Sequence, residues 1–552
     1  MSAGTETNAL AAARRLAAVA GEAMERAQAA AALATDGGRL IDDHQVHAER
    51  IAQLATEARA AQELVAYSEQ QAGAGRRDTF AEEQTFAFAA ETVHRLRGAV
   101  EASPDAFALD GPTREALDDA GLRSLVRAGL DEARLRAIGA RAIASRGAHA
   151  WELDDPAAAL TRDSARTFAK TEIAPIAQEM HRQDHLVPEE LLEKMAGLGL
   201  FGCSVPEAYG GTEMGYLTMV ALTEELSAAS LVAGSIITRS EILTRALIQG
   251  GTEEQRRQWL PRIASGELIV GICVTEPDIG SDVASVQCRA TPGEMHERRG
   301  WFIEGAKAWS TFAGRANILG LLARTDPDPA AGARGLSLFI VEKDPFNGHS
   351  FVQAQQGGGS ITGTANPTPG YRGMHSFTLA IDRYFVPEEH LVGAGAGLNR
   401  GFYLQMGGFA AGRLQTGGRA TGVAQASLEK ACHYVSERRQ FGRPIGEYQL
   451  TQYKIGRMAT HVAAARQLTY AAAREMAHDE RAAMAPAMCK LLASDVAVWV
   501  SQEAQLIHGG WGYSEEDPVA RYVVDALVLP IFEGVKPILE LKIIARQLLA
   551  GG

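Results

Sequence analysis

Apolar positions follow a helical period through the first part of the chain. Apolar residues recur three and four positions apart in 10–30, 51–67 and 80–100. Clusters of glycine with aspartate or alanine separate these stretches. Alanine and arginine predominate up to about residue 150, and the first lysine is Lys170. The pattern predicts a helical extension over residues 1–150.

Helical periodicity continues over residues 151–268. Helices are predicted over 165–183, 188–198 and 216–229, and Pro175 predicts a kink or break in the first of them. Thr252 precedes a helical stretch and is expected to be its N-cap.

The pattern changes at about Ile269, where short β-rich segments begin to alternate with glycine and proline turns. Strands are predicted over 269–274, 301–303, 318–323, 336–341 and 377–381. This spacing predicts a small sheet or barrel domain over residues 269–393.

Long helical patterns return after residue 394. They cover 402–437, 449–476, 483–506 and 538–549, and the short connections between them favour a four-helix bundle over residues 394–552. The predicted fold class is therefore mainly α with a central β-barrel domain, preceded by a helical extension.

Composition narrows the function classes. A chain of 552 residues is too long for a single core, and its net charge of −13 argues against nucleic acid as a general partner. The five cysteines are scattered without a CxxC pair, which predicts neither a disulfide framework nor a metal site and suits a reducing cytoplasm. No uninterrupted apolar run reaches the roughly 18–20 residues of a membrane span. We expect a cytoplasmic protein without a membrane span.

Two segments of the β-rich region carry candidate chemistry. The loop Val274–Asp282 follows a predicted strand and offers hydroxyls and amides to a polar ligand, although a plain turn would also explain it. Trp309 and Thr311 are two residues apart, so an extended strand would place an indole and a hydroxyl on one face. A buried structural tryptophan is the alternative.

Two further segments lie in the C-terminal helical region. Arg438 belongs to a cationic cluster at a helix end, where arginine suits either a phosphate or the helix C-terminus itself. The segment Gln505–Tyr513 contains three glycines, which allow a backbone to approach a ligand closely, whereas a helix C-cap normally needs one.

An acid near the C-terminus is the candidate general base. Glu533 lies between an apolar run and Gly534, and Pro537 begins the last helical stretch. In a dry pocket, desolvation would raise the pKa of this acid towards that of a useful base. A solvated carboxylate near a helix N-terminus is the alternative.

Taken together and in this order, these motifs resemble the acyl-CoA dehydrogenase family over roughly residues 155–550. The resemblance implies a helical domain, a β-barrel and a four-helix bundle. It also implies FAD between barrel and bundle, with a contribution from a neighbouring subunit, and hence a homodimer or homotetramer. The implied FAD contacts are Ile272, Cys273, Val274, Thr275, Gly280, Ser281, Trp309, Ser310, Thr311, Arg438, Phe441, Gln449, Gln505, Gly509 and Gly510.

The resemblance further implies the reaction. Glu533 would be the base that removes the α-proton of an acyl-CoA, while the β-hydride passes to flavin N5 and electrons continue to an electron-transfer flavoprotein. The implied substrate contacts are Ser281, Arg413, Arg239 and Gly534. An acyl-CoA oxidase, a flavin monooxygenase and a catalytically idle acyl-CoA-binding or scaffold protein remain alternatives.

The N-terminal extension and several short segments resemble one branch of the family, the bacterial (2S)-methylsuccinyl-CoA dehydrogenases. The segments are Gly370–Met374, Gly412–Thr416, Ala465–Tyr470 and Ile531–Gly534. This implies methylsuccinyl-CoA as substrate and mesaconyl-CoA as product, with another short-chain or branched acyl-CoA as the alternative.

A dicarboxylic substrate needs a cationic partner for its second carboxylate. Arg239 occupies a position that lines the pocket in the family, and pairing with Glu241 or Glu224 on the surface is the alternative. The chain also departs from the usual family pattern at Leu506, Val524 and Val535–Pro537.

Overall fold

The computed structural model describes residues 8–149, 151–479 and 482–550. The chain divides into two compact units. The first combines the residues up to Asp154 with those from Thr416 onward, and the second is Asp155–Gln415.

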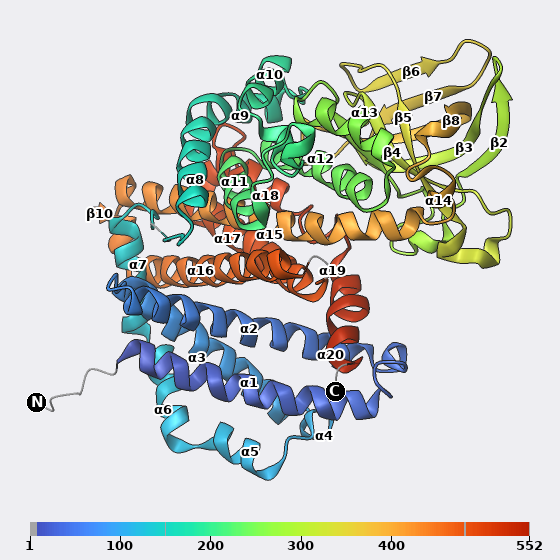
Figure 1. The fold of residues 1–552 in the computed structure, drawn as a ribbon. Coiled ribbons are helices and arrows are strands. Elements are labelled where there is room, and N and C mark those ends of the chain that lie inside the picture. The colour runs from blue at the N-terminus through green and yellow to red at the C-terminus, as the bar shows by residue number, and fades with distance from the viewer. Residues whose placement is uncertain (1–7, 150, 480–481, 551–552) are drawn as a thin grey trace, which may run out of the picture. The chain divides into compact units, whose positions relative to one another are not determined.

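Three long helices begin the first unit: α1 (Ala9–Ala34), α2 (Gln45–Gly73) and α3 (Thr79–Ala102). They pack side by side in Figure 1, and alanines fill most of their buried faces. Asn8 and Asp78 cap α1 and α3 by accepting backbone N–H groups. The predicted helices of the extension are confirmed.

Shorter helices follow in a stretch where no element was predicted. They are α4 (Pro104–Phe107), α5 (Gly111–Asp118), α6 (Ala120–Gly129) and α7 (Glu132–Ala144). Aspartates cap the last three, so their starts carry a sequence signal even though their apolar faces are short.

The rest of the first unit is the C-terminal helical part. It contains α15 (Gly401–Glu437) from Thr416 onward, α16 (Gln449–His478), α17 (Met484–His508), α18 (Pro518–Ala526), α19 (Lys536–Ile538) and α20 (Arg546–Ala550). A π-helical segment, Leu539–Ala545, joins α19 to α20 within the stretch predicted as one helix. The helix α18 was not predicted.

The extension and the C-terminal helices share one core, because α2, α3 and α7 all pack against α16. Two glycines permit the closest approach. A Cβ on Gly139 of α7 would lie 1.7 Å from the Gln452 carbonyl oxygen, and a Cβ on Gly456 of α16 would lie 2.0 Å from the Leu135 carbonyl oxygen. Helices α2, α3 and α7 of the extension are therefore part of this unit's core.

The second unit begins with helices: α8 (Pro156–Phe168), α9 (Ala174–Arg182), α10 (Glu189–Gly197), α11 (Gly215–Ala229), α12 (Leu231–Gly250) and α13 (Glu253–Ala264). The irregularity expected at Pro175 is a π-helical turn, Ala169–Ile173, that comes just before it. Thr252 caps α13 in a full capping box with Gln255, as predicted.

The β-rich region forms one sheet of eight strands: β1 (Val270–Cys273), β2 (Arg289–Met295), β3 (Arg298–Thr311), β4 (Ile318–Arg324), β5 (Leu336–Glu342), β6 (Ser350–Ala354), β7 (Ser360–Ala365) and β8 (Ser376–Pro387). The order is β1-β4-β2-β3-β8-β7-β6, and β5 pairs with β4. Helix α12 packs against β1. The strands β2, β6 and β7 were not predicted.

One described helical stretch, Met484–Tyr513, is long and apolar enough to cross a membrane. However, 78% of its most apolar window is buried inside the protein. Burial of this kind is typical of the core helix of a bundle.

Candidate active site

Glu533 lies in the first unit, in the turn that joins α18 to α19. Its backbone has a φ of +51°, and the next residue, Gly534, has a φ of +100°. A glutamate whose backbone is in the left-handed region is strained, and such strain persists where the surrounding structure holds the residue in place. Here the buried Lys490 ammonium donates a 2.6 Å hydrogen bond to the Gly534 carbonyl. The turn thus directs the Glu533 side chain inward, where it is 1% exposed.

A second buried charge accompanies this acid. Arg419 of α15 is fully buried, and its Nη2 lies 3.6 Å from Glu533 Oε1. Its guanidinium stacks 4.5 Å from the ring centre of Phe532 and donates a 2.7 Å hydrogen bond to the Thr416 hydroxyl. The cation stabilises the charged form of the carboxylate inside the core. Arg419 was not predicted from the sequence, where the signal is a single charged residue among the mostly small, uncharged residues 417–426.

The unusual residues after Glu533 have structural roles. The Lys536 amide donates a 2.9 Å hydrogen bond to the Pro530 carbonyl, which closes the turn. Its ammonium lies 2.7 Å from Asp495 Oδ2 on α17. Burial would lower the pKa of Lys536, but the bond to Asp495 outweighs it and raises that pKa. The departure at Val535–Pro537 therefore anchors the turn to α17.

The predicted loop after β1 lies in the second unit. The side chains of Ile272, Cys273 and Val274 are buried, Thr275 is half-buried, and Gly280 and Ser281 are exposed. Burial raises the pKa of the Cys273 thiol to about 11, so this thiol stays neutral. The residues 272–274 can therefore contact a ligand only through their backbone. Thr275, Gly280 and Ser281 also present side-chain or backbone surface to solvent.

A buried ion pair holds the loop in place. The Lys307 ammonium lies 2.9 Å from Glu276 Oε1 and donates a 3.0 Å hydrogen bond to the Val274 carbonyl. Glu276 also accepts the backbone N–H groups of Gln287 and Cys288, each at 2.8 Å. Every charge in the pair therefore has additional hydrogen bonds, which is the condition for a stable buried ion pair.

The structure brings Trp309, Ser310 and Thr311 next to this loop. The Ala308 amide donates a 2.8 Å hydrogen bond to the Thr275 carbonyl, so the two predicted segments are neighbours. A bulge in β3 gives Trp309 a φ of +55° and leaves this residue 58% exposed. Ser310 and Thr311 are buried, and the Thr311 hydroxyl lies 3.1 Å from the Ser376 hydroxyl. Trp309 is therefore an exposed aromatic surface and not a buried structural tryptophan.

The remaining predicted cofactor residues lie in the first unit. Arg438 precedes a short hairpin, β9 (Arg439–Gln440) and β10 (Arg443–Pro444), whose turn holds Phe441 at a φ of +50°. Phe441 is 95% exposed, and Gln449 at the start of α16 is exposed too. The hairpin is close to the glycine segment, because Tyr434 stacks on His508 with ring centres 4.2 Å apart.

The glycine segment itself forms a short helical turn, Gly509–Tyr513. Gln505 donates a 3.0 Å hydrogen bond to the Gly512 carbonyl, while Leu506 is 68% exposed. A Cβ on Gly509 or Gly510 would meet nothing within 4 Å, so both present open backbone surface. The structure thus brings the hairpin, the start of α16 and the glycine segment close to one another in the first unit.

Two predicted substrate residues lie in the helices of the second unit. Arg239 in the middle of α12 is 6% exposed, and Glu224 and Glu241 are also buried. The alternative of a surface ion pair with Glu224 or Glu241 is therefore wrong, because all three side chains are buried. Arg413 of α15 is half-buried.

Each donor set, taken by itself, suits a different part of a flavin dinucleotide. An exposed indole beside buried hydroxyls and a backbone loop suits a flat heterocycle. An arginine near open glycine backbone suits a pyrophosphate and a nucleoside.

Models of known families decide the family. The acyl-CoA dehydrogenase N-terminal domain matches residues 155–267, the middle domain matches 271–383 and the C-terminal domain matches 399–549. The chain belongs to the acyl-CoA dehydrogenase family. It is accordingly an FAD-dependent oxidoreductase that acts on an acyl-CoA.

Three relatives illustrate the similarity. The (2S)-methylsuccinyl-CoA dehydrogenase of Cereibacter sphaeroides is 39% identical over 391 residues, which cover 71% of this chain and 69% of the relative. A glutaryl-coenzyme A dehydrogenase solved with glutaryl-CoA is 30% identical, with a TM-score of 0.65, and covers 73% of this chain and 97% of its own. The structure reported for the electron-transferring flavoprotein of Acidaminococcus fermentans is 28% identical, with a TM-score of 0.64, and covers 73% and 98%.

Proposed function

We propose that the chain oxidises (2S)-methylsuccinyl-CoA to mesaconyl-CoA, with Glu533 as the base. The single observation that carries the reaction is the buried Glu533 carboxylate on its strained turn beside Arg419. The substrate rests on the 39% identity to a methylsuccinyl-CoA dehydrogenase. The aligned residues are 71% of this chain and 69% of that relative, so the two chains have nearly the same length. The relative thus also has room for an extension of this size.

The chain's own residues account for the proton step. The α-hydrogen of a thioester is a poor acid, so its removal needs a positioned carboxylate in a site that excludes water. Glu533 is such a carboxylate, since its side chain is 1% exposed. Lys490 fixes the backbone directly after it through the Gly534 carbonyl. FAD supplies the acceptor for the β-hydride when it is bound.

The segments of the second unit would hold the flavin. Trp309 offers an exposed aromatic face, and Thr311 and Thr275 offer hydroxyls from two neighbouring segments. The Lys307–Glu276 pair keeps the two segments together. Arg438, Gly509 and Gly510 are the proposed contacts of the pyrophosphate and adenosine part, which the family resemblance assigns to the FAD of a partner copy in the case of Arg438.

An acyl-CoA panel tests the substrate. Turnover would be measured with a dye acceptor for methylsuccinyl-, glutaryl-, butyryl- and isovaleryl-CoA. We expect kcat/KM for methylsuccinyl-CoA to exceed that for butyryl- and isovaleryl-CoA by at least about tenfold, because these two lack the second carboxylate, and also to exceed that for the unbranched glutaryl-CoA. A higher kcat/KM for butyryl- or isovaleryl-CoA would overturn the substrate but leave the base. A flavin that no acyl-CoA bleaches would favour a binding or scaffold protein.

Arg239 is our candidate partner for the distal carboxylate. A buried carboxylate needs a cation to offset its desolvation, and Arg239 is a buried arginine in the helical part of the second unit. Internal pairing with Glu224 or Glu241 is the competing role. We expect Arg239→Ala to raise KM for methylsuccinyl-CoA by at least about tenfold more than KM for butyryl-CoA. Equal changes for both substrates, in this variant and in Arg239→Lys, would assign Arg239 to internal pairing.

We also propose a homo-oligomer that passes its electrons to an electron-transfer flavoprotein. Large apolar side chains are exposed at the hairpin end of the first unit, which favours contact with a second copy: Phe441, Leu450, Leu506, Trp511 and Tyr513. Light scattering would give the mass of the flavin-loaded protein. A monomer whose flavin content is unchanged by Phe441→Asp would contradict the oligomer, and electron transfer to a purified flavoprotein acceptor would test the partner.

A further inference from the structure

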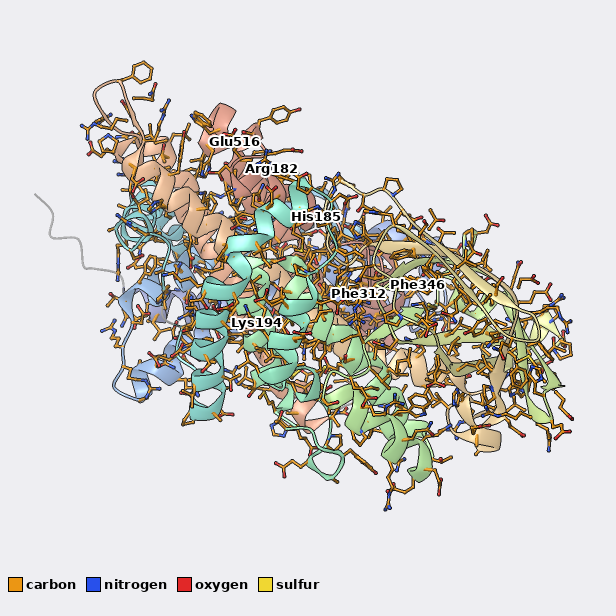
Figure 2. The ribbon with its side chains drawn as sticks, turned by 90° about the horizontal axis from the view of Figure 1, so that it is seen from above. Arg182, His185, Lys194, Phe312, Phe346 and Glu516 are labelled. Carbon is orange, nitrogen blue, oxygen red and sulfur yellow. The ribbon has the colours of Figure 1, made fainter. Side chains whose placement is uncertain are left out.

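Three potential metal ligands converge in the second unit, away from Glu533 in the sequence. Asp184 follows α9, His349 directly precedes β6, and His375 directly precedes β8. Their ligand atoms all lie within 4.8 Å of one another. In Figure 2, Arg182 and His185 mark the chain on either side of Asp184, and Phe312 and Phe346 mark neighbouring parts of the sheet domain.

The spacing of the three side chains matches one coordination sphere. His349 Nε2 lies 3.0 Å from Asp184 Oδ2, His375 Nε2 lies 3.0 Å from Asp184 Oδ1, and the two Nε2 atoms are 3.2 Å apart. An ion about 2.1 Å from each ligand holds neighbouring ligand atoms roughly 3.0–3.5 Å apart. The separation of the two Nε2 atoms falls within this range, and so does the distance from each histidine to its nearer carboxylate oxygen. The two histidines face different oxygens of Asp184, so the carboxylate would hold the ion through both.

Hydrogen bonding explains the same cluster less well. To bond one carboxylate, both histidines must direct an Nε2–H towards it, and at 3.2 Å these two hydrogens crowd each other. A cation reverses the requirement, because each Nε2 then offers a lone pair to the same point. The backbone supports a fixed arrangement, since Asp184 and His375 hold φ angles of +54° and +51° without being glycine.

The site is open on one side and closed on the other. The side chain of His375 is 3% exposed, whereas those of Asp184 and His349 are 43% and 53% exposed. An ion can therefore enter from solvent and keep a water as a further ligand. Two imidazoles and one carboxylate suit Zn²⁺ better than Mg²⁺ or Ca²⁺, which take oxygen ligands.

Two features limit the affinity. Arg372 Nε lies 3.5 Å from Asp184 Oδ1 and shares this carboxylate with the ion. The buried His375 Nδ1 has no hydrogen-bond partner among the residues that the structure describes, so no second hydrogen bond holds the orientation of the imidazole ring. Such outer partners are typically worth 10–100-fold in metal affinity. We therefore expect micromolar rather than nanomolar binding.

We propose that Asp184, His349 and His375 bind one Zn²⁺-class divalent ion that clips the end of α9 to the sheet. The bound ion would also stabilise the strand end that carries the predicted flavin contact Thr311. The His375 carbonyl accepts a 2.9 Å hydrogen bond from the Phe312 amide, and the next residue, Ser376, contacts Thr311. The ion is structural: it takes no part in proton or hydride transfer.

Metal binding to the flavin-loaded protein tests the proposal. The full chain would be treated with a chelator, dialysed, and titrated with Zn²⁺ by calorimetry, with Co²⁺ absorption as a second readout. We expect one Zn²⁺ per chain with a Kd in the micromolar range, and a higher Tm in its presence. Co²⁺ should give the absorption bands typical of a four- or five-coordinate ion. The variants His349→Ala and Asp184→Asn should lower the affinity by at least tenfold.

His296→Ala is the matched control, because His296 is an exposed histidine of the same unit that lies 3.2 Å from the Gln356 carbonyl oxygen. It should bind Zn²⁺ as the unchanged chain does. His349 is half exposed, so its replacement should not unfold the protein. Zn²⁺ binding that is absent, well below one per chain, or equal in His349→Ala and the unchanged chain would overturn the site and leave the dehydrogenase reaction untouched.

Discussion

At the scale of single residues, the candidate site depends on buried charges, each of which lies next to a charge of opposite sign. Glu533 lies beside Arg419, and Glu276 lies beside Lys307. Removing one partner of a buried ion pair strongly destabilises the fold, because the remaining charge stays in the core without a counter-charge. The two pairs have different tasks, since the first holds the proposed base and the second holds the loop predicted to contact the flavin.

The Lys307–Glu276 pair gives a direct prediction. Glu276→Gln should lower the free energy of unfolding by about 3–5 kcal/mol and weaken FAD retention, because Lys307 is left as an unpaired buried cation. The matched control is Glu304→Gln, which removes an exposed pair with Arg289 and should cost at most about 1 kcal/mol. Thermal unfolding and flavin content after gel filtration measure both effects. Equal losses in the two variants would show that the pair does not hold the loop.

At the scale of elements, long periodic patterns were predictable and short ones were not. The long helices of the extension and the C-terminal part follow directly from their apolar spacing. The strands β2, β6 and β7 were missed because they alternate weakly and carry glycine, proline or many exposed positions. The helices α4, α5, α6 and α18 are too short for periodicity to distinguish them from loops. Helix α7 is longer, and its start was marked by the capping Asp131.

The candidate site was predictable only in part, for the same reason. Motif order gave Glu533, Trp309 and Thr311, since each belongs to a local sequence pattern. Arg419 and Lys490 act through contacts between elements far apart in the chain, and no local pattern marks such contacts.

Helix α7 gives a prediction at the element scale. Gly139 touches the backbone of α16 so closely that any Cβ would overlap the Gln452 carbonyl oxygen. Gly139→Val should therefore separate α7 from α16 and lower the Tm by several degrees, as overpacking costs about 1–3 kcal/mol or more. The matched control is Gly98→Val on α3, where a Cβ would meet nothing within 4 Å. If Gly139→Val is no less stable than Gly98→Val, the close approach of the two helices is wrong.

At the scale of the whole molecule, the extension and the C-terminal helices make one unit. Their contact includes Glu91 of α3, whose carboxylate lies 3.0 Å from His461 Nε2 and 3.4 Å from an Arg457 nitrogen on α16. Burial would raise the pKa of Glu91, but its interactions with His461, Arg457 and Arg95 outweigh burial and lower that pKa to about 2.

The shift of Glu91 predicts how the stability of this unit depends on pH. Because the folded pKa of about 2 is below the unfolded value of 4.5, Glu91 stabilises the fold fully above pH 4.5. This contribution is lost as the pH falls from 4.5 towards 2, by about 1 kcal/mol per pH unit. Glu91→Gln should thus destabilise the protein clearly at pH 6 and distinctly less at pH 3.5, measured by urea unfolding. Glu101→Gln, at an exposed site on α3, is the control. A penalty for Glu91→Gln that does not change with pH would contradict the assignment.

The most direct test of the central claim is the reduction of bound FAD in Glu533→Gln. Anaerobic stopped-flow absorption would follow flavin bleaching with the acyl-CoA that reduces the unchanged chain fastest, so the result does not depend on the substrate proposal. We predict unchanged FAD content and bleaching slowed by about 10²–10⁴-fold, because glutamine cannot accept the α-proton. Glu540→Gln, which removes a buried acid on the following π-helical segment, should keep most of the rate. Bleaching by Glu533→Gln within tenfold of the unchanged rate would contradict Glu533 as the base.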